Sequence, residues 1–378
     1  MQIHPAHTIP FDDLAARLKA ARDQRVVYER HDSQSGRPGG LTLYVYTERC
    51  VYDGLWDLAS ISARGLILDL AARKIVATPF PKFFNLGERD GTAPDLPFEV
   101  TEKLDGSLII LFHHQGVWRT ATKGAFESPQ AMWARERLAE RDLGALQPGT
   151  TYLAEATYPE NRIVVRHDVG ALRLLGAYDG GGIELPYADI ERVGAAAGLP
   201  AARRQNFGSL AELLRTTKAL PKTEEGFVAR FENGLRLKVK GDEYKRIHAL
   251  VSRVTPLALW ELMAAGSDLD AIRRDIPEEF WGDFDAIVAI ISGQIAENVA
   301  LVGEAAKAVA HLTDKELGLT HATLDERVRP YLFDYRKSGG KLGHRSMATM
   351  FRNVRPTGNV LAGYTPSFAV NRVQDDNG

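Results

Sequence analysis

The sequence predicts an α+β protein, with a largely antiparallel sheet in its first two-thirds and an all-helical domain after it. Between Val26 and Lys240, short apolar runs alternate with clusters of turn residues, which is the pattern of β-strands. Segments with helical spacing separate these runs, and beyond Tyr244 the spacing is helical only. A chain of 378 residues is also longer than one hydrophobic core usually supports. We therefore expect two domains, at residues 1–245 and 246–378.

Each element is predicted from its local pattern. Strands are expected where short apolar runs stand between turn clusters, at residues 41–46, 65–70, 98–102, 108–112 and 162–165. Helices are expected between them where apolar residues recur at three- and four-residue spacing, at residues 129–141, 187–197 and 209–219. In the second domain, Thr255-Pro256 predicts a helix start, and residues 285–310 carry isoleucines near helical spacing.

The composition excludes several classes of protein. The 47 Lys and Arg nearly balance the 49 Asp and Glu, so any nucleic-acid site must be local. Cys50 is the only cysteine, which excludes an internal disulfide framework and a thiolate metal cluster and suits a reducing compartment. The chain does not open with a basic segment leading into an apolar run, and no run approaches eighteen apolar residues. We expect a protein that is neither secreted nor membrane-spanning.

One hairpin is predicted in detail from an Asn-Gly pair. Two strand-like segments flank Asn233-Gly234, which favours a two-residue type I′ turn. In that register Ala229 faces Lys238 and, by the alternation of side chains along strands, Glu225, Lys238 and Lys240 share one face. Such a face suits an anion and metal site. An exposed hairpin with solvated lysines is the alternative.

A lysine before an Asp-Gly turn is the first candidate for chemistry. Lys103 ends a predicted strand, and Asp105-Gly106 forms a tight turn into the next one. A chain of this length contains Lys-x-Asp-Gly by accident in roughly one case in twenty at average residue usage, so the motif alone is a weak signal. A surface lysine before an ordinary hairpin turn is the alternative.

Other blocks surround this lysine in a defined order. They are Arg64-Gly65, Lys82-Phe-Phe-Asn85, Lys123-Gly124, Glu155 followed by Pro159-x-Asn-Arg-Ile-Val164, Glu225-Gly226, and Lys238-x-Lys-x-Asp-x-Tyr244. In this order they resemble the covalent lysyl-nucleotidyltransferases and, within them, the T-even phage RNA ligase 1 family, over the chain to residue 246. The resemblance implies an antiparallel-sheet nucleotidyltransferase domain with the DNA ligase-type, ATP-grasp-like adenylation fold. A helical domain that recognises RNA is implied after it.

Adenylation chemistry requires these residue types on physical grounds. Attack on the α-phosphorus of ATP needs a neutral amine, and neighbouring cations, including a metal ion, would lower the pKa of Lys103. The same cations would bind the phosphates of ATP and the departing pyrophosphate. The candidates are Arg64, Lys82, Lys123, Lys238 and Lys240. Asp105, Glu155 and Glu225 are candidates to hold one hydrated Mg²⁺ or Mn²⁺ ion.

The resemblance implies the remaining roles. Lys103 takes AMP from ATP, the AMP passes to a 5′-phosphate end of RNA, and a 3′-hydroxyl then attacks that end and releases AMP. Tyr46 would lie in the nucleotide pocket and Tyr244 would be needed for joining, with packing in the core or at the domain junction as the alternatives. Asp268 resembles a metal-binding aspartate of the family, with a helix N-cap as the alternative.

The expected partners are ATP and RNA with 5′-phosphate and 3′-hydroxyl ends, as in repair of a nicked tRNA anticodon loop. A separate kinase or phosphatase would prepare the ends, and we expect a monomer in the cytoplasm of a bacterium or a phage-infected cell. Residues 323–356 hold eight Lys or Arg interleaved with four aromatic residues, which suits an RNA surface. A basic helical face with core aromatics is the alternative.

Other functions share parts of this pattern. A DNA ligase or a capping-type nucleotidyltransferase would use the same lysine chemistry, but a β-rich OB-fold is expected after the hairpin in both. A non-sealing RNA-binding protein on the same scaffold would have no use for buried like charges, which only destabilise. An enzyme arrested at lysyl-AMP would label itself and seal nothing.

Overall fold

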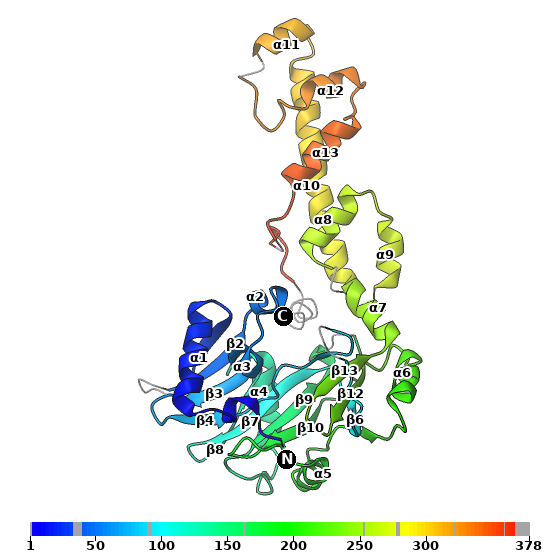
Figure 1. Cartoon of the computed structure of the whole chain (residues 1–378). Coiled ribbons are helices and arrows are strands. Elements are labelled where there is room, and N and C mark those ends of the chain that lie inside the picture. The colour runs from blue at the N-terminus through cyan, green and yellow to red at the C-terminus, as the bar shows by residue number, and fades with distance from the viewer. Residues whose placement is uncertain are drawn as a thin grey trace. The chain divides into compact units, whose positions relative to one another are not determined.

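The structure, a computed structural model, describes residues 2–32, 40–88, 92–161, 164–251, 254–276, 280–320, 323–358 and 360–366. The chain divides into two compact units, the first ending at Arg246 and the second beginning at Ile247. The first unit combines helices with three mainly antiparallel sheets, and the second is helical in its described part (Figure 1). The predicted fold class is therefore confirmed.

The first sheet has the strand order β1-β2-β3-β4, and every neighbouring pair is antiparallel. Its strands are β1 (Val27–His31), β2 (Leu41–Tyr46), β3 (Arg64–Asp69) and β4 (Lys74–Ala77). One face packs against helical segments through side chains such as Leu14 and Leu66. These segments are η1 (Pro5–His7), α1 (Phe11–Asp23), α2 (Glu48–Tyr52) and α3 (Leu58–Ser62).

The second sheet lies against the other face of the first one. Its order is β10-β9-β7-β8, with β7 (Ser107–His114), β8 (Val117–Ala121), β9 (Thr151–Thr157) and β10 (Ala171–Tyr178). Phe112 and Leu153 pack against Leu43 and Ile67 of the first sheet, so the two sheets share one apolar core. The outer face of the second sheet is covered by α4 (Pro129–Ala139) and α5 (Tyr187–Ala196), while η3 (Pro159–Asn161) follows β9.

The third sheet contains three of the predicted site residues, Lys103, Lys238 and Lys240. Its order is β11-β6-β12-β13-β5, with β5 (Phe84–Asn85), β6 (Phe98–Lys103), β11 (Arg204–Gln205), β12 (Gly226–Phe231) and β13 (Arg236–Lys240). Only the β13–β5 pair among these is parallel. Leu213 of α6 (Leu210–Lys218) packs on the apolar face that includes Phe227 and Val239. By alternation, Lys238 and Lys240 point to the opposite face.

The β12–β13 hairpin differs from the prediction by one residue. Lys238 lies opposite Val228, where Ala229 was expected. The loop has three residues, because the amide of Phe231 donates to Leu235 O at 2.9 Å and Gly234 takes a φ of +83°. Asn-Gly suits this loop as well as a two-residue turn, since a glycine in the left-handed region can close a three-residue hairpin. The predicted two-residue turn is wrong.

A predicted strand at residues 162–165 is also wrong where the structure describes it. Residues 162 and 163 lie outside the described part, and Val164 and Val165 form a bend. Their amides donate to the carboxylate of Asp105 instead of to a neighbouring strand. The predicted helices at 129–141, 187–197 and 209–219 correspond to α4, α5 and α6.

The second unit is organised around one long helix. Ile287, Ile291 and Ile295 of α10 (Trp281–Ala308) are buried, and α10 contacts three of the other helices. Although it contains no run of eighteen apolar residues, α10 is long and apolar enough, by length and composition alone, to cross a membrane. Core helices of soluble proteins pass the same test. The helix α7 (Asp242–Val251) begins in the first unit and ends in the second. The further helices are α8 (Pro256–Ala264), α9 (Leu269–Asp275), α11 (Asp314–Thr320), α12 (Leu332–Lys337) and α13 (His344–Asn353).

Candidate active site

Glu225 bridges two lysines at the end of the third sheet. Its Oε2 accepts from Lys103 Nζ at 2.7 Å, and its Oε1 lies 3.0 Å from Lys240 Nζ. Gly226 pairs with Lys103 on one side and with Lys240 on the other, so both lysines end beside this carboxylate. The Glu225 side chain is only 2% exposed, against 19% for Lys103.

Gly226 explains how Glu225 joins the lysines despite the shifted register. The observed pairing puts Lys240 on the face of Gly226, so regular alternation would place Glu225 on the opposite face. Gly226 has a φ of +144°, which breaks the alternation, and a Cβ there would overlap the carbonyl oxygen of Val239. The predicted grouping of Glu225, Lys238 and Lys240 is therefore reached by a different backbone path.

The charge state of Lys103 differs from the prediction. Burial disfavours its protonated form, but Glu225, Glu155 and Asp105 outweigh burial and raise the pKa of the amine above its usual value. The same pair lowers the pKa of the Glu225 carboxyl, because Lys103 and Lys240 together outweigh its burial. The expected depression of the nucleophile's pKa by neighbouring cations is thus absent in the free protein, since a carboxylate lies closer than any of those cations.

The lowered pKa that was expected for Lys103 is found for Lys238 instead. Burial, followed by the charges of Lys103 and Arg64, lowers the pKa of its amine well below the usual value. Its Nζ lies 5.1 Å from the ring centre of Phe83, and Arg64 Cζ lies 5.6 Å from the same ring. The buried Nη1 of Arg64 has no hydrogen-bond partner in the described part of the chain. A buried donor without a partner, beside a lysine whose amine an anion would help to protonate, is a favourable site for an anion.

Lys82 lies inside a group of three aromatic rings. Its Nζ is 5.0 Å from the centre of Tyr46, 5.2 Å from Trp56 and 5.6 Å from Phe84. Burial alone would raise the pKa of the Tyr46 hydroxyl, but the charges of Lys123, Lys82 and Arg64 lower it below its usual value. The predicted cations Arg64, Lys82 and Lys123 therefore converge on Tyr46.

Asp105 acts as a structural hub of the turn that follows Lys103. Its Oδ2 accepts from the amides of Val164 and Val165 at 2.8 and 2.7 Å, and its Oδ1 accepts from the Tyr244 hydroxyl at 2.9 Å. Burial, then the charge of Glu225, raises the pKa of the Asp105 carboxyl. Tyr244 is buried, and the centre of its ring lies 5.1 Å from Lys240 Nζ. It thereby connects the nucleophile's turn to α7.

Two of the three carboxylates that were predicted to hold a hydrated metal ion are engaged by protein partners. Both oxygens of Asp105 are used by hydrogen bonds, and both oxygens of Glu225 are used by lysines. Glu155 does reach the turn, because a Cβ on Gly106 would come within 2.8 Å of its Cγ. Within the described ranges, no three His, Cys, Asp or Glu residues are grouped so that they could hold a metal ion. The side chains present do not fit a protein-only metal cage.

Asp268 lies in the second unit and caps a helix. Its side chain accepts from the amide of Ala271 at 2.9 Å at the start of α9. This is the N-cap alternative, and a carboxylate in that role stabilises the first turn.

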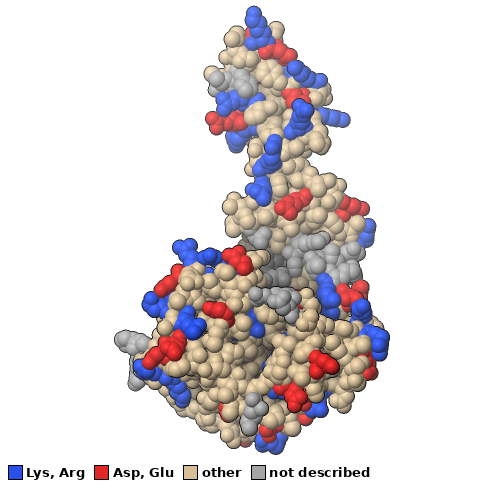
Figure 2. All heavy atoms as spheres, in the orientation of Figure 1, with Lys and Arg blue, Asp and Glu red and all other residues tan. Residues whose placement is uncertain are grey.

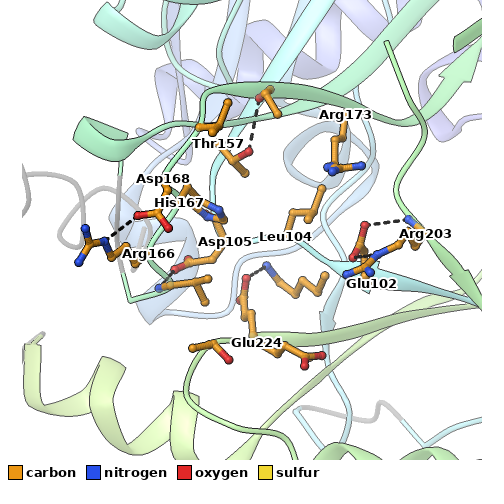
Figure 3. Close-up of a pocket in the computed structure, with 17 residues that line it drawn as sticks. Glu102, Leu104, Asp105, Thr157, Arg166, His167, Asp168, Arg173, Arg203 and Glu224 are labelled. Atoms are coloured by element: carbon orange, nitrogen blue, oxygen red, sulfur yellow. Dashed lines mark hydrogen bonds and ion pairs between the residues drawn. The ribbon is translucent and has the colours of Figure 1, made fainter. Parts of the chain in front are cut away.

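A pocket of about 330 Å³ adjoins the amine of Lys103 (Figure 3). Lys103 and Glu225 line it, whereas Arg64, Lys82, Lys123, Lys238 and Lys240 do not. Lys103 therefore lines the pocket, shares the carboxylate of Glu225 with Lys240 and lies within electrostatic reach of Lys238. The lining residues are Glu102 to Asp105, Thr157, Val165 to Val169, Ala171, Arg173, Arg203 and Thr223 to Gly226.

Sequence reasoning missed several of these residues. Trp56 had no signal except that it is aromatic, and Phe83 and Phe84 were noted only as part of a motif. Arg173 and His167 line the pocket from segments without a motif, and only the pairing of β9 with β10 brings Arg173 beside Glu155.

Comparison with known proteins supports one family. Residues 62–244, about half of the chain, match the family model described as RNA ligase, of the T4 RNA ligase 1 type. These residues are therefore similar to the T4 RNA ligase 1 family. The predicted resemblance is therefore confirmed, and the matched segment contains every candidate site residue of the first unit except Tyr46.

Two RNA ligase relatives differ in how much they share with the chain. A Thermovibrio ammonificans protein with the provisional name RNA ligase is 31% identical over 202 residues, which are 49% of this chain and 52% of that protein. The RNA ligase of Rhodothermus phage RM378 is 24% identical over 348 residues, covering 68% of this chain and 78% of the phage protein. The chain thus spans only about half the length of the Thermovibrio relative.

The fold of the chain is also similar to that of a solved structure. An archaeal ATP-dependent RNA ligase superposes with a TM-score of 0.50 at 17% identity, covering 75% of this chain and 83% of that one. At this identity the likeness concerns the fold, which is that of the nucleotidyltransferase ligases.

Proposed function

We propose that the chain is an ATP-dependent RNA ligase that joins a 5′-phosphate to a 3′-hydroxyl through a lysyl-AMP intermediate on Lys103. The observation that carries this proposal is that Lys103 lines a nucleoside-sized pocket while its amine shares Glu225 with Lys240 and lies within electrostatic reach of Lys238. A nucleotide that lies across the amine would put its sugar and base in the pocket and its phosphates among the cations. The match of residues 62–244 to the RNA ligase family model supports the same chemistry.

The cations would bind the triphosphate in a preorganised way. Arg64 already has a buried donor that no described residue uses, and Lys238 gains a proton readily once phosphate charge is present. Positive groups held in place before binding stabilise charge on the α-phosphate and on the departing pyrophosphate. We therefore assign Arg64, Lys82, Lys123, Lys238 and Lys240 to the phosphates of ATP.

Glu225 is the base within reach of the nucleophile. Its Oε2, 2.7 Å from Lys103 Nζ, can accept the proton that the amine must lose before it attacks. A divalent ion such as Mg²⁺ or Mn²⁺, when it accompanies the phosphates of ATP, supplies further positive charge there. The chain's own carboxylates do not form a metal cage, so the roles above are those of its side chains.

The proposed reaction has three transfers. Lys103 Nζ attacks the α-phosphorus, a P–N bond forms, and the P–O bond to pyrophosphate breaks. A 5′-phosphate oxygen of RNA then attacks the AMP phosphorus and releases the lysine. Finally a 3′-hydroxyl attacks the activated 5′-phosphate, loses its proton, and AMP leaves. We assign Tyr244 and Asp105 to positioning the nucleophile's turn, since neither oxygen of Asp105 is left for substrate.

The second unit carries basic side chains that suit RNA. Figure 2 shows lysines and arginines gathered around α11 to α13, and the exposed ones include Arg327, Lys337, Lys341, Arg345, Arg352 and Arg355. Tyr331 is buried and therefore belongs to the core, while Phe351 is half-buried. We propose this surface as a contact for RNA phosphates, with a nicked tRNA as one substrate and a separate kinase or phosphatase to prepare its ends.

Joining assays distinguish the RNA ligase from its alternatives. Labelled RNA and DNA strands with 5′-phosphate and 3′-hydroxyl ends are offered in parallel with ATP and Mg²⁺, both single-stranded and as nicked duplexes. We expect sealing of RNA ends to exceed sealing of DNA ends. Preferential sealing of nicked duplex DNA would make it a DNA ligase, and self-labelling without sealing would make it an arrested enzyme. A helical second unit, where a DNA ligase would continue in a β-rich domain, favours RNA.

A further inference from the structure

Arg173 is one of three arginines that line the pocket beside Lys103. It has no hydrogen-bond or ion-pair partner among the described residues. The other two arginines of the lining are each paired with an acid. Arg203 Nε donates to Glu102 at 2.8 Å, and Arg166 Nε donates to Asp168 at 2.9 Å. The Arg173 guanidinium is therefore the one available for a ligand.

The sheet fixes where this guanidinium lies. Arg173 on β10 is directly opposite Glu155 on β9, and directly opposed residues of antiparallel strands point to the same face. Glu155 packs on the turn after Lys103, as the close approach at Gly106 shows. Figure 3 shows the half-buried Arg173 side chain pointing from β10 toward Leu104, the neighbour of the nucleophile.

The pocket lacks the ring that a nucleobase would usually stack on. None of its lining residues in the described part is Phe, Tyr or Trp. Its planar groups are the guanidiniums and the ring of His167, and that ring is tied through Nε2 to the carbonyl of Asp105 at 2.7 Å. Leu104, Val169 and Ala171 supply apolar surface. A flat guanidinium stacks on aromatic faces, so Arg173 can take the place of the missing ring.

We propose that Arg173 stacks on the purine base of the bound nucleotide and so provides the enzyme's affinity for the base. This rests on the proposed function for the position of the nucleotide. The phosphates of ATP are bound elsewhere, because none of the five cations assigned to them lines the pocket. A ligand in the pocket therefore meets Arg173 with its base and sugar, not with its triphosphate.

Three variants separate stacking from charge. Arg173→Ala removes both, Arg173→Lys keeps the charge without the plane, and Arg173→Phe keeps a plane without the charge. Arg192→Ala is the matched control, because Arg192 is exposed and lies on α5, where it pairs with Asp189 at 3.0 Å. Dissociation constants for AMP and for ribose 5-phosphate are measured by calorimetry on each full-length protein, together with the KM for ATP in lysyl-AMP formation.

Stacking predicts a specific pattern across ligands. Arg173→Ala should weaken AMP binding and raise the KM for ATP by about tenfold, the usual scale of one stacked base, while ribose 5-phosphate binding stays within about twofold. Arg173→Phe should restore most of the preference for AMP, and Arg173→Lys should not. Recovery by lysine in place of phenylalanine, or equal losses for both ligands, would show a phosphate contact and overturn the proposal. So would unchanged binding in all variants.

This pattern can be told apart from failure of the proposed function. Binding of AMP and ribose 5-phosphate is measured without any covalent step. If the wild-type protein bound AMP through Arg173 but formed no lysyl-AMP, the ligase proposal would fail and the stacking proposal would stand. If lysyl-AMP formed normally and the Arg173 variants changed only the sealing of pre-adenylylated RNA, Arg173 would contact RNA and the stacking proposal would fail.

Discussion

Lys103 Nζ donates to Glu225 Oε2 at 2.7 Å, and this contact holds the proposed nucleophile in its charged form. Because Glu225, Glu155 and Asp105 raise the pKa of Lys103, the neutral amine is a minor species near pH 7. In the proposed reaction, the amine must therefore lose this proton before it attacks the α-phosphorus.

The first prediction concerns pH. With a raised Lys103 pKa, the neutral fraction grows with pH, so kcat/KM for lysyl-AMP formation should rise by about tenfold per unit from pH 6.5 to 8.5. In Glu225→Gln the carboxylate that raises this pKa is gone, so the midpoint should move to lower pH even though the maximum rate falls. The pH profile of adduct formation at low ATP measures both. A flat wild-type profile, or a midpoint moved upward in the variant, would contradict the ion-pair assignment.

The second prediction is a trade of stability against activity at Lys238. Burial, and then the charge of Lys103, hold the pKa of Lys238 in the folded state below its value in the unfolded state. The unfolded state therefore binds this proton more tightly, and at neutral pH the Lys238 site lowers the free energy of unfolding. Lys238→Met should therefore stabilise the free protein by about 1 kcal/mol and slow lysyl-AMP formation at least about 100-fold. The stability gain should shrink as pH rises toward the ordinary lysine pKa, because the folded and unfolded states then bind protons alike.

Thermal unfolding between pH 7 and 10 checks the gain at Lys238. Lys222→Met, at an exposed position, is the control and should change neither property. Loss of stability in Lys238→Met would refute the assignment of an unfavourable buried charge.

The third prediction concerns Tyr244. Tyr244→Phe removes the hydroxyl that donates to Asp105 at 2.9 Å, which should cost about 1 kcal/mol of unfolding free energy. We expect sealing of pre-adenylylated RNA to fall more than lysyl-AMP formation, because the resemblance assigns this tyrosine to joining. Tyr364→Phe removes a similar Tyr–Asp hydrogen bond, of 2.7 Å to Asp283, in the second unit. Equal losses of sealing in both variants would show that the effect is one of stability alone.

The fourth prediction concerns the rings around Lys82. Trp56→Leu removes one of three rings within 5.6 Å of the Lys82 amine, so Lys82 should be less well held for phosphate. The KM for ATP in lysyl-AMP formation should rise about threefold to tenfold, the scale of one partly buried cation–π contact, with little change in the rate at saturating ATP. Tyr52→Leu, at a tyrosine that is 80% exposed, should leave the KM unchanged. A fall in the saturating rate with an unchanged KM would argue against a phosphate role for Lys82.

The sequence predicted the parts of the site that depend on local patterns. Lys103 before its Asp-Gly turn and the two lysines of β13 follow from strand alternation and turn chemistry, which act over a few residues. The loop length after Phe231 did not follow, because Asn-Gly fits two hairpin geometries. With the observed register, regular alternation would place Glu225 on the face opposite to Lys238 and Lys240. The positive φ of Gly226 breaks the alternation and returns Glu225 to the face of the lysines.

Properties that depend on tertiary neighbours were not predicted correctly. The neighbouring lysines and arginine of the sequence motifs predicted a low pKa for Lys103. The fold shows that the carboxylate of Glu225 lies nearer to the Lys103 amine than those cations do, and the pKa is raised. The three hydrogen bonds that Asp105 accepts were not predicted, because their donors come from segments about sixty residues and more than a hundred residues away. Arg173 carries no motif, and the pairing of β9 with β10 alone gives it a place in the pocket.

The position of a covalent AMP adduct identifies the nucleophile. The purified protein is incubated with ATP and Mg²⁺, denatured, digested and mapped by mass spectrometry. We expect one AMP per chain, linked to Lys103 and absent from Lys103→Ala. An adduct on another residue, or none on a folded wild-type protein that still binds ATP, would contradict the assignment of Lys103 as the nucleophile.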